Sequence, residues 1–341
     1  MENNVGSLPY PTRLSLATAR SLLARAVDKT EALRQTGTFI VVDSSGSPVS
    51  AARMDGCAPG ALAIVRAKAF GAAANGEPSA SFAARMAKFS PAVFASYQAV
   101  LRDQPFPGGG AMLVEKEGTA LGAMATGLGI GPFVKLAGIE PSELIVDGKP
   151  ANLEDLIISY ALGIDYSPQH GDDMARWVDA YGGPPDPGIK GTGLSPAPRA
   201  SAQARLGRAQ AIADHIVGEA ANKGARVAVA IVDAAGDVVT LDRMDGAPPM
   251  GVDVAAAVAV ASVNFGVASG EIAAQKHYSA ALDRLLATVP YPMLALPGGY
   301  PLGPQDEPAG GVGIHCHDLD LAQELARGAA QWAATNFEGE R

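Results

Sequence analysis

The chain has 341 residues, 48% of them apolar and 18% charged, so it is long enough for two domains and too apolar to be disordered. Its net charge is −9, and its Lys and Arg residues are scattered, which argues against nucleic-acid binding because that affinity comes mostly from neutralising phosphates. Residues 1–16 lack the apolar core of a signal peptide, and the longest uncharged Ala/Val stretch, 254–270, falls short of a membrane span. Two cysteines are ordinary for a reducing compartment. We therefore expect a cytoplasmic protein with no membrane or nucleic-acid partner.

The residue pattern predicts one series of elements twice. Each series begins with an amphipathic helix and a β-hairpin, continues with an Ala-rich helix and a further helical stretch, and ends with a strand after a Pro-Gly-Gly loop. We expect that loop between the last two strands. The predicted ranges are 14–33, 38–42, 59–73 and 121–126 in the first half, and 206–222, 227–232, 249–263 and 312–317 in the second, with a final helix over 320–335. This order predicts an α+β fold with a mainly antiparallel sheet.

The two halves are related by a constant offset of 190 positions. Val42–Gly56 and Val232–Gly246 are identical at eight of fifteen positions, and both carry Val-Asp-x-x-Gly followed by Arg-Met-Asp-Gly. The same offset pairs Pro107-Gly108-Gly109 with Pro297-Gly298-Gly299. An offset that stays constant over that distance indicates that the chain contains two copies of one domain.

Three segments follow from the duplication. We assign residues 12–127 to copy one and residues 200–337 to copy two. Residues 128–199 have no counterpart in copy two and predict an inserted spacer with helices over 153–162 and 172–181, followed by a Pro/Gly-rich linker.

These motifs resemble the GlcG/HbpS family, which includes the C-terminal domain of PduO-type proteins. The resemblance rests on the hairpin with Arg-Met-Asp-Gly, the Pro-Gly-Gly loop, and a closing strand that begins with a small residue and glycine. It implies two tandem profilin-like α/β/α domains, each with a five-stranded, mainly antiparallel sheet. It also implies oligomers, and haem or a related tetrapyrrole as the ligand of some members.

Histidines distinguish copy two from copy one. Two of the five, His315 and His317, lie on the predicted closing strand, where our alignment places Met124 and Thr126 in copy one. Side chains alternate along a strand, so both imidazoles are expected on one face, with Cys316 on the other. They can chelate a divalent metal ion with Asp318 as a third ligand, act as an acid/base pair, or supply an axial ligand to haem. The structural alternative is a half-exposed pair at an interface.

Several other residues of copy two are candidates for substrate binding. Arg243 could clamp a carboxylate, or form a salt bridge to a nearby Asp. The backbone N–H groups of Gly298 and Gly299 could hold a carboxylate, or the glycines could serve a tight turn. His277 and Tyr278 could line the same pocket, or lie on a solvated helix face.

Some polar residues have a structural reading instead. Asp55 and Asp245 suit turn or helix-cap roles because they recur in both copies. His215 is expected at the boundary of the core. His170 with Asp172 and Asp173 could bind a metal ion, although acidic residues at a helix start usually serve as caps. Lys68 in copy one is replaced by Val258 in copy two, so the two clefts are expected to differ.

Two functions remain after the absent motifs are considered. The chain lacks an NAD, FAD or ATP motif and a serine nucleophile elbow. The first hypothesis, from the resemblance, is a haem- or tetrapyrrole-binding protein with its site in copy two. The alternative is a lyase, isomerase or hydrolase that acts on a small anionic carboxylate through His315, His317 and Asp318. In either case we expect a homo-oligomer with a small-molecule ligand.

Overall fold

The computed structural model describes residues 14–33, 35–101, 103–128, 145–146, 149–150, 153–166, 204–274, 292–304 and 308–337. Its contacts divide the chain into two compact units. The copy-one unit comprises Ala17–Ala211 with Val238–Thr240, and the copy-two unit comprises Met1–Leu16, Ile212–Asp237 and Leu241–Arg341. Each unit is described by itself. Over the described residues, no helix is both long enough and apolar enough to cross a bilayer.

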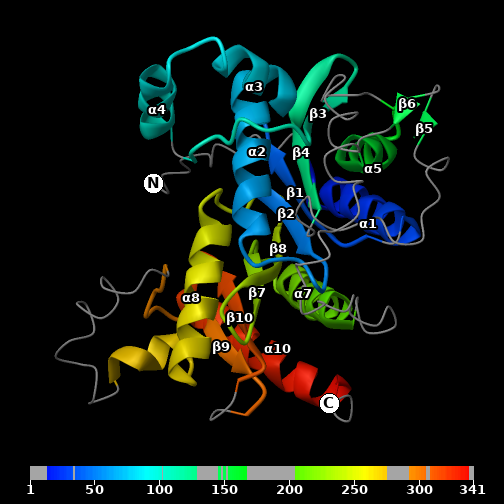
Figure 1. Cartoon of the computed structure of the whole chain (residues 1–341). Coiled ribbons are helices and arrows are strands. Elements are labelled where there is room, and N and C mark those ends of the chain that lie inside the picture. The colour runs from blue at the N-terminus through cyan, green and yellow to red at the C-terminus, as the bar shows by residue number, and fades with distance from the viewer. Residues whose placement is uncertain are drawn as a thin grey trace, which may run out of the picture. The chain divides into compact units, whose positions relative to one another are not determined.

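The first copy is an antiparallel sheet with helices packed on it (Figure 1). Its strands are ordered β3-β4-β1-β2, α2 lies against β1 and β4, and α5 packs on β4 and β3. The bounds are α1 (Leu16–Ala32), β1 (Gly37–Asp43), β2 (Pro48–Arg53), α2 (Ala61–Asn75), α3 (Ser79–Met86), α4 (Pro91–Val100), β3 (Ala111–Lys116), β4 (Thr119–Leu128), β5 (Ile145–Val146), β6 (Lys149–Pro150) and α5 (Leu153–Leu162).

The second copy repeats this plan with the strand order β8-β7-β10-β9. Helix α8 packs on β7, β10 and β9, and α10 packs on β10 and β9 (Figure 1). The bounds are α7 (Ala204–Asn222), β7 (Ala228–Asp233), β8 (Val238–Arg243), α8 (Gly251–Phe265), the 3-10 helix η2 (Ser269–Ala274), β9 (Gly299–Leu302), β10 (Gly310–His315) and α10 (Leu319–Asn336). The predicted α+β class with antiparallel sheets is confirmed, and the described residues of each copy contribute four strands.

Burial on both faces explains why the strands are rich in consecutive apolar residues. Every residue of β1 and of β2 is buried, as expected for a sheet that is covered on both faces. In α8 the apolar residues surround the helix rather than forming one stripe, and ten of its fifteen residues are buried. The predicted helix over 153–162 is α5, with the same bounds, whereas the predicted helix over 172–181 lies outside the described residues.

The strand register corrects our alignment of the two closing strands. Thr126 of β4 pairs with Phe39, and Ile314 of β10 pairs with Val229, which is the duplicate of Phe39. Thr126 therefore corresponds to Ile314, and Gly127 corresponds to His315. The alignment of His315 with Met124 was wrong by three residues.

The Pro-Gly-Gly loops need a similar correction. Thr126 N donates to Gly110 O and Ile314 N donates to Gly298 O, each over 2.8 Å, so Gly298 corresponds to Gly110 rather than to Gly108. The loops precede β3 and β9 instead of lying between the last two strands. The cause is the segment before the loop, which is two residues longer in copy one, and a comparison at a constant offset cannot represent that difference.

The spacer is not entirely without a counterpart. Helix α5 follows β4 and packs on β4 and β3, as α10 follows β10 and packs on β10 and β9. The Glu154 side chain of α5 accepts from Leu128 N and lies beside Gly110, while Gln323 of α10 accepts from Gly298 N. The start of the spacer thus supplies copy one with the helix that α10 supplies to copy two.

The repeated Arg-Met-Asp-Gly motifs hold structure in both copies. Arg53 and Arg243 are 2% and 1% exposed and donate to the carbonyls of Cys57 and Ala247. Asp55 accepts from the backbone N and from Nε of Arg205 in the first turn of α7, and Asp245 accepts from Leu16 N at the start of α1. The predicted turn role of both aspartates is confirmed. They do not cap the helices that follow them, whose N-caps Gly60 and Met250 make no side-chain cap bond; instead they cap the first turns of α7 and α1.

Loss of such a cap should weaken folding measurably. We expect Asp55→Ala and Asp245→Ala each to lower the free energy of unfolding by about 1 kcal/mol, because backbone N–H groups lose a charged acceptor. Urea denaturation followed by circular dichroism measures this change. Asp28→Ala on the exposed surface of α1 is the control and should have no effect. Equal stability of all three variants would refute the assignment.

Candidate functional site

His315 is the last residue of β10 and lies beside the N-terminus of α8. A side chain added at Gly251, the first residue of α8, would approach within 3.3 Å of His315 Nδ1. That nitrogen is buried and has no hydrogen-bond partner among the described residues. Burial lowers the pKa of the imidazole, and the nearby His317 lowers it further. His315 is therefore expected to be neutral at pH 7, with a ring nitrogen available to a ligand.

The neighbours of His315 do not continue the strand. Because β10 ends at His315, the alternation expected for a strand does not extend to Cys316 and His317. His317 is exposed, and Asp318 is the N-cap of α10, where its Oδ1 accepts from Leu321 N over 3.0 Å. Within the described ranges, no group of three or more His, Cys, Asp or Glu residues is placed to hold a metal ion.

Copy one has no room for a histidine at the equivalent position. A side chain added at Gly127 would come within 2.8 Å of Val65 Cγ1 on α2. The duplicate of Val65 is the smaller Ala255 on α8. The space that His315 uses in copy two is therefore occupied by α2 in copy one.

The Pro-Gly-Gly loop of copy two is engaged in internal contacts. Gly298 N donates to Gln323 Oε1 over 3.1 Å, and Gly299 N donates to Ser269 Oγ over 2.8 Å. Gly298 has φ +124°, and a side chain there would collide with the Ile314 carbonyl oxygen. In this structure neither N–H group is available to a carboxylate, and the loop performs the tight-turn role that we considered as its alternative.

Arg243, a further candidate, is engaged in an internal hydrogen bond. The guanidinium of Arg243 is enclosed in the fold, where it holds the Ala247 carbonyl. His277 and Tyr278 lie outside the described residues, as do His170, Asp172 and Asp173.

Burial makes both cysteines poorly reactive. Cys57 and Cys316 are free thiols and are buried. Burial raises the pKa of each thiol, although hydrogen bonds to neighbouring groups partly oppose the shift. A neutral buried thiol is a poor nucleophile and a poor metal ligand, so Cys316 adds no chemistry to the site beside it.

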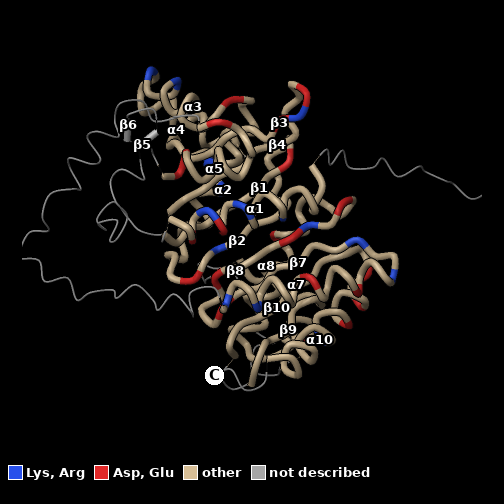
Figure 2. The backbone as a smooth tube through the Cα atoms, turned by 90° about the vertical axis from the view of Figure 1, so that its right-hand side faces the viewer, with Lys and Arg blue, Asp and Glu red and all other residues tan. Residues whose placement is uncertain are grey.

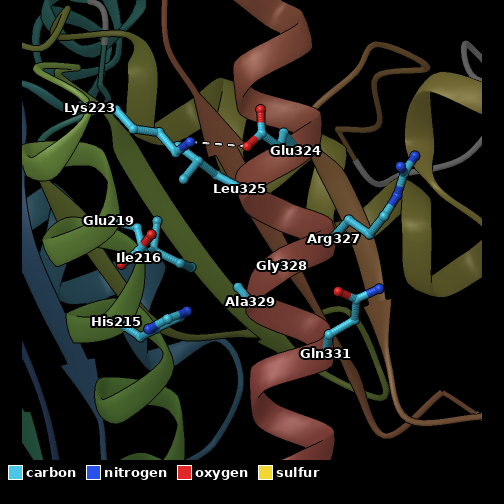
Figure 3. A pocket seen from close by; sticks show the side chains of 10 residues that line it. All are labelled: His215, Ile216, Glu219, Lys223, Glu324, Leu325, Arg327, Gly328, Ala329 and Gln331. Carbon is cyan, nitrogen blue, oxygen red and sulfur yellow. Dashed lines mark hydrogen bonds and ion pairs between the residues drawn. The ribbon is translucent and has the colours of Figure 1, made fainter.

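A groove of about 310 Å³ lies between α7 and α10 of the copy-two unit (Figure 3). Lys223, just after the end of α7, and Glu324 of α10 form an ion pair of 3.1 Å at one end, and His215 lies toward the other. The His215 ring stacks on Trp332 with centroids 4.7 Å apart. Charged side chains lie around the groove, and His315 is not among the residues that line it.

Charged residues of both signs are mixed along the described part of the chain. Figure 2 shows Lys and Arg interspersed with Asp and Glu over the described residues.

Comparison with known families decides the identity of the fold. A family model described as "Haem degrading protein HbpS-like" matches residues 14–128 and 205–331, which together make up more than half of the chain. The chain belongs to the HbpS-like family. The two matched segments bear out the resemblance of both copies to GlcG/HbpS domains.

Solved structures similar to this HbpS-like chain each cover little more than a third of it. A double mutant of HbpS from Streptomyces reticuli is 30% identical over 37% of this chain and 84% of its own, with a TM-score of 0.34. The protein ORFY of Klebsiella pneumoniae is 23% identical over 39% and 91%, with a TM-score of 0.36. A PduOC:heme complex is 25% identical over 37% and 91%, with a TM-score of 0.34. No curated protein matches the chain.

Sequence reasoning missed a buried ion pair in copy one of this HbpS-like protein. Lys68 of α2 is 7% exposed, and its Nζ lies 2.9 Å from Glu154 Oε2 and 3.4 Å from the Thr126 carbonyl oxygen. The replacement of Lys68 by Val258 in copy two was the available signal. Glu154 gave no such signal, because it lies in the spacer, which has no sequence counterpart in copy two.

The structural role of the Pro-Gly-Gly loop can be tested by comparing two glycine-to-alanine substitutions. Gly298→Ala should lower the free energy of unfolding by about 1–3 kcal/mol, because alanine is strained at φ +124° and collides with a carbonyl oxygen. Gly328→Ala on α10 is the control, since it meets open space and removes a helical glycine; it should stabilise by up to about 1 kcal/mol. Urea unfolding measures both. A Gly298→Ala protein as stable as the wild type would contradict the structural role.

Proposed function

We propose that this HbpS-like chain binds haem or a related tetrapyrrole in copy two, with His315 as the axial ligand. One observation carries the proposal: His315 is a half-buried imidazole whose buried Nδ1 has no partner among the described residues. A buried polar atom without a hydrogen bond is costly and calls for an explanation. Coordination of a metal centre is an explanation that suits a neutral imidazole.

The residues around His315 fit such a ligand. The lowered pKa keeps the ring nitrogen free of a proton at pH 7, as axial ligation of haem iron requires. Gly251 leaves the approach to Nδ1 free of a side chain, and Met250 at the N-cap of α8 is 61% exposed. When bound, the iron would supply redox or ligand-exchange chemistry, while His315 would fix its position and electron density.

The site is proposed to be single in each chain. Copy one has Gly127 at the position of His315, and Val65 takes the space beside it. The family-level relation to a haem-degrading protein supports the class of ligand. The differences between the copies support its location in copy two.

The alternative enzyme loses most of its expected substrate contacts in this structure. Arg243, the N–H groups of Gly298 and Gly299, and the Asp318 carboxylate all serve internal hydrogen bonds. His315 and His317 remain as a metal-binding or acid/base pair. Chelation of a simple metal ion by this pair is therefore a defined outcome of the experiment below, rather than a second proposal.

The test is an absorption titration of the purified chain with haemin. We expect a saturable Soret shift at one equivalent per chain, and a loss of affinity of more than tenfold in His315→Ala because the iron loses its protein ligand. His317→Ala should retain the shift. His215→Ala, whose ring is covered by Trp332, is the matched control and should titrate as the wild type does.

Two outcomes would count against the proposal. A flat titration would exclude haem binding by the chain. A Soret shift that His315→Ala leaves unchanged would exclude His315 as the ligand. A parallel titration with Zn²⁺ separates the metal-chelating alternative: binding of Zn²⁺ without haemin, lost in both His315→Ala and His317→Ala, would replace haem by a metal ion.

The proposal includes a cytoplasmic homo-oligomer. Both cysteines are free, which is consistent with a reducing compartment. Helix α4 has no buried residue, and the segment 89–101 carries no charge while exposing Phe89, Val93 and Val100. An uncharged face suits a second copy of the same acidic chain, because no like charges meet there, and exposed apolar patches commonly mark association surfaces.

Light scattering tests the oligomer directly. We expect the wild type to be larger than one chain, and Val93→Asp with Val100→Asp to dissociate it, since charge would be buried in the contact. Glu115→Ala on the exposed end of β3 is the control. A monomeric wild type would refute association, and an oligomer that survives the double substitution would remove α4 from the interface.

A further inference from the structure

The buried ion pair of copy one has the contacts of a carboxylate-binding site. The carboxylate of Glu154 receives Lys68 Nζ at 2.9 Å on Oε2 and the backbone N–H of Leu128 at 3.3 Å on Oε1. Gly110 leaves room for it, since a side chain at that position would collide with Oε2. The carboxylate thus sits between an ammonium group and a backbone donor, which is a common way to recognise a carboxylate ligand.

Copy two shows that the fold does not need this pair. At the place of Glu154, Gln323 accepts a hydrogen bond from Gly298 N and donates from Nε2 to Gly299 O. At the place of Lys68, copy two has Val258. A neutral amide and an apolar side chain therefore close the same region of the same fold without any charge.

The free-energy cost of burying two charges also favours a binding role for the ion pair over a purely structural one. Removing an ammonium and a carboxylate from water costs several kcal/mol, and their attraction often only offsets that cost. A neutral pair of similar volume is commonly as stable or more stable. Since copy two has that neutral solution, the ion pair of copy one is better explained by binding than by stability.

We propose that copy one contains a second site, for a small carboxylate, and that Glu154 occupies it as an internal ligand. The site consists of Lys68 Nζ, the Leu128 N–H group and the open space beside Gly110. Its ligand is a small molecule whose carboxylate replaces that of Glu154. The site is independent of haem binding, because none of these residues belongs to the copy-two unit.

Exchange at this site needs only a local movement. The Glu154 side chain is 22% exposed, whereas that of Lys68 is 9% exposed, so the carboxylate is the part nearer to solvent. Helix α5 is held to α1 elsewhere: Arg25 Nη2 donates to Tyr160 O over 2.6 Å, and its guanidinium lies 5.3 Å from the Tyr160 ring centroid. Glu154 can therefore rotate outward while α5 stays attached.

The experiment weakens the internal ligand with Glu154→Gln, because a neutral amide pairs less strongly with Lys68 than a carboxylate does and so yields more readily to acetate. Acetate is titrated by calorimetry at constant ionic strength into the wild type, Glu154→Gln and the double variant Lys68→Val with Glu154→Gln. We expect saturable binding to Glu154→Gln, at least about tenfold tighter than to the wild type, because a tethered carboxylate competes at high effective concentration. The double variant should not bind acetate.

Controls make each outcome decisive. Acetamide has the shape of acetate without its charge and should bind to none of the three proteins. Thermal unfolding shows whether the variants are folded, and at the concentration that half-saturates Glu154→Gln, acetate should raise the melting temperature of that variant more than that of the wild type or the double variant. Equal affinity of the wild type and Glu154→Gln overturns the proposal, and so does acetate binding that survives the loss of Lys68. No binding to the wild type at about one hundred times the concentration that half-saturates Glu154→Gln would also overturn it. The haemin titration is unaffected by any of these results.

Discussion

The antiparallel pairing of the closing strand with the first strand of each copy is the constraint on which both candidate sites depend. Pairing of β10 with β7 sets Ala228 opposite His315, and pairing of β4 with β1 sets Thr38 opposite Gly127. Because side chains alternate along a strand, a slip of one residue would move the imidazole to the opposite face of the sheet. The register therefore places His315 against the N-terminus of α8.

The same register explains why the two copies carry different chemistry at one end of the sheet. In copy two, Gly251 and Ala255 leave space on α8, and an imidazole fills it. In copy one, Val65 takes that space, and the charged side chain is instead Lys68, one turn further along α2. The polar group of copy one meets the helix of the spacer, whereas that of copy two remains without a partner among the described residues. Substitutions at a few positions of one scaffold thus place an imidazole in copy two and an ammonium group in copy one, which are the two groups on which our proposals rest.

The sequence predicted those parts of the fold in which local pattern decides structure. Apolar periodicity placed α5 at its observed bounds, and the recurring Asp55 and Asp245 indicated turns that the structure confirms, although the helices that they cap are α7 and α1. It could not predict the correspondence of His315 with Gly127, because the segment before the Pro-Gly-Gly loop differs in length between the copies and no local pattern fixes the alignment beyond it. Nor could it assign Gly298 to an internal contact, because the partner Gln323 lies on the next helix and was not distinguishable from a solvated residue.

The contrast between the repeated and the altered positions tells structure from function within one chain. The Arg-Met-Asp-Gly residues are the same in both copies because each holds backbone groups that every copy must satisfy: Arg53 and Arg243 bind carbonyls from within the core, and the aspartates cap helices. Such buried donors and acceptors leave little freedom, since an unpaired polar group costs about 1–3 kcal/mol. The pairs Gly127 and His315, Lys68 and Val258, and Glu154 and Gln323 differ between the copies, so the shared fold does not depend on any one of these side chains. At Lys68 and Glu154 copy one has a charged pair where copy two has a neutral one, and this contrast is the basis of the proposed carboxylate site.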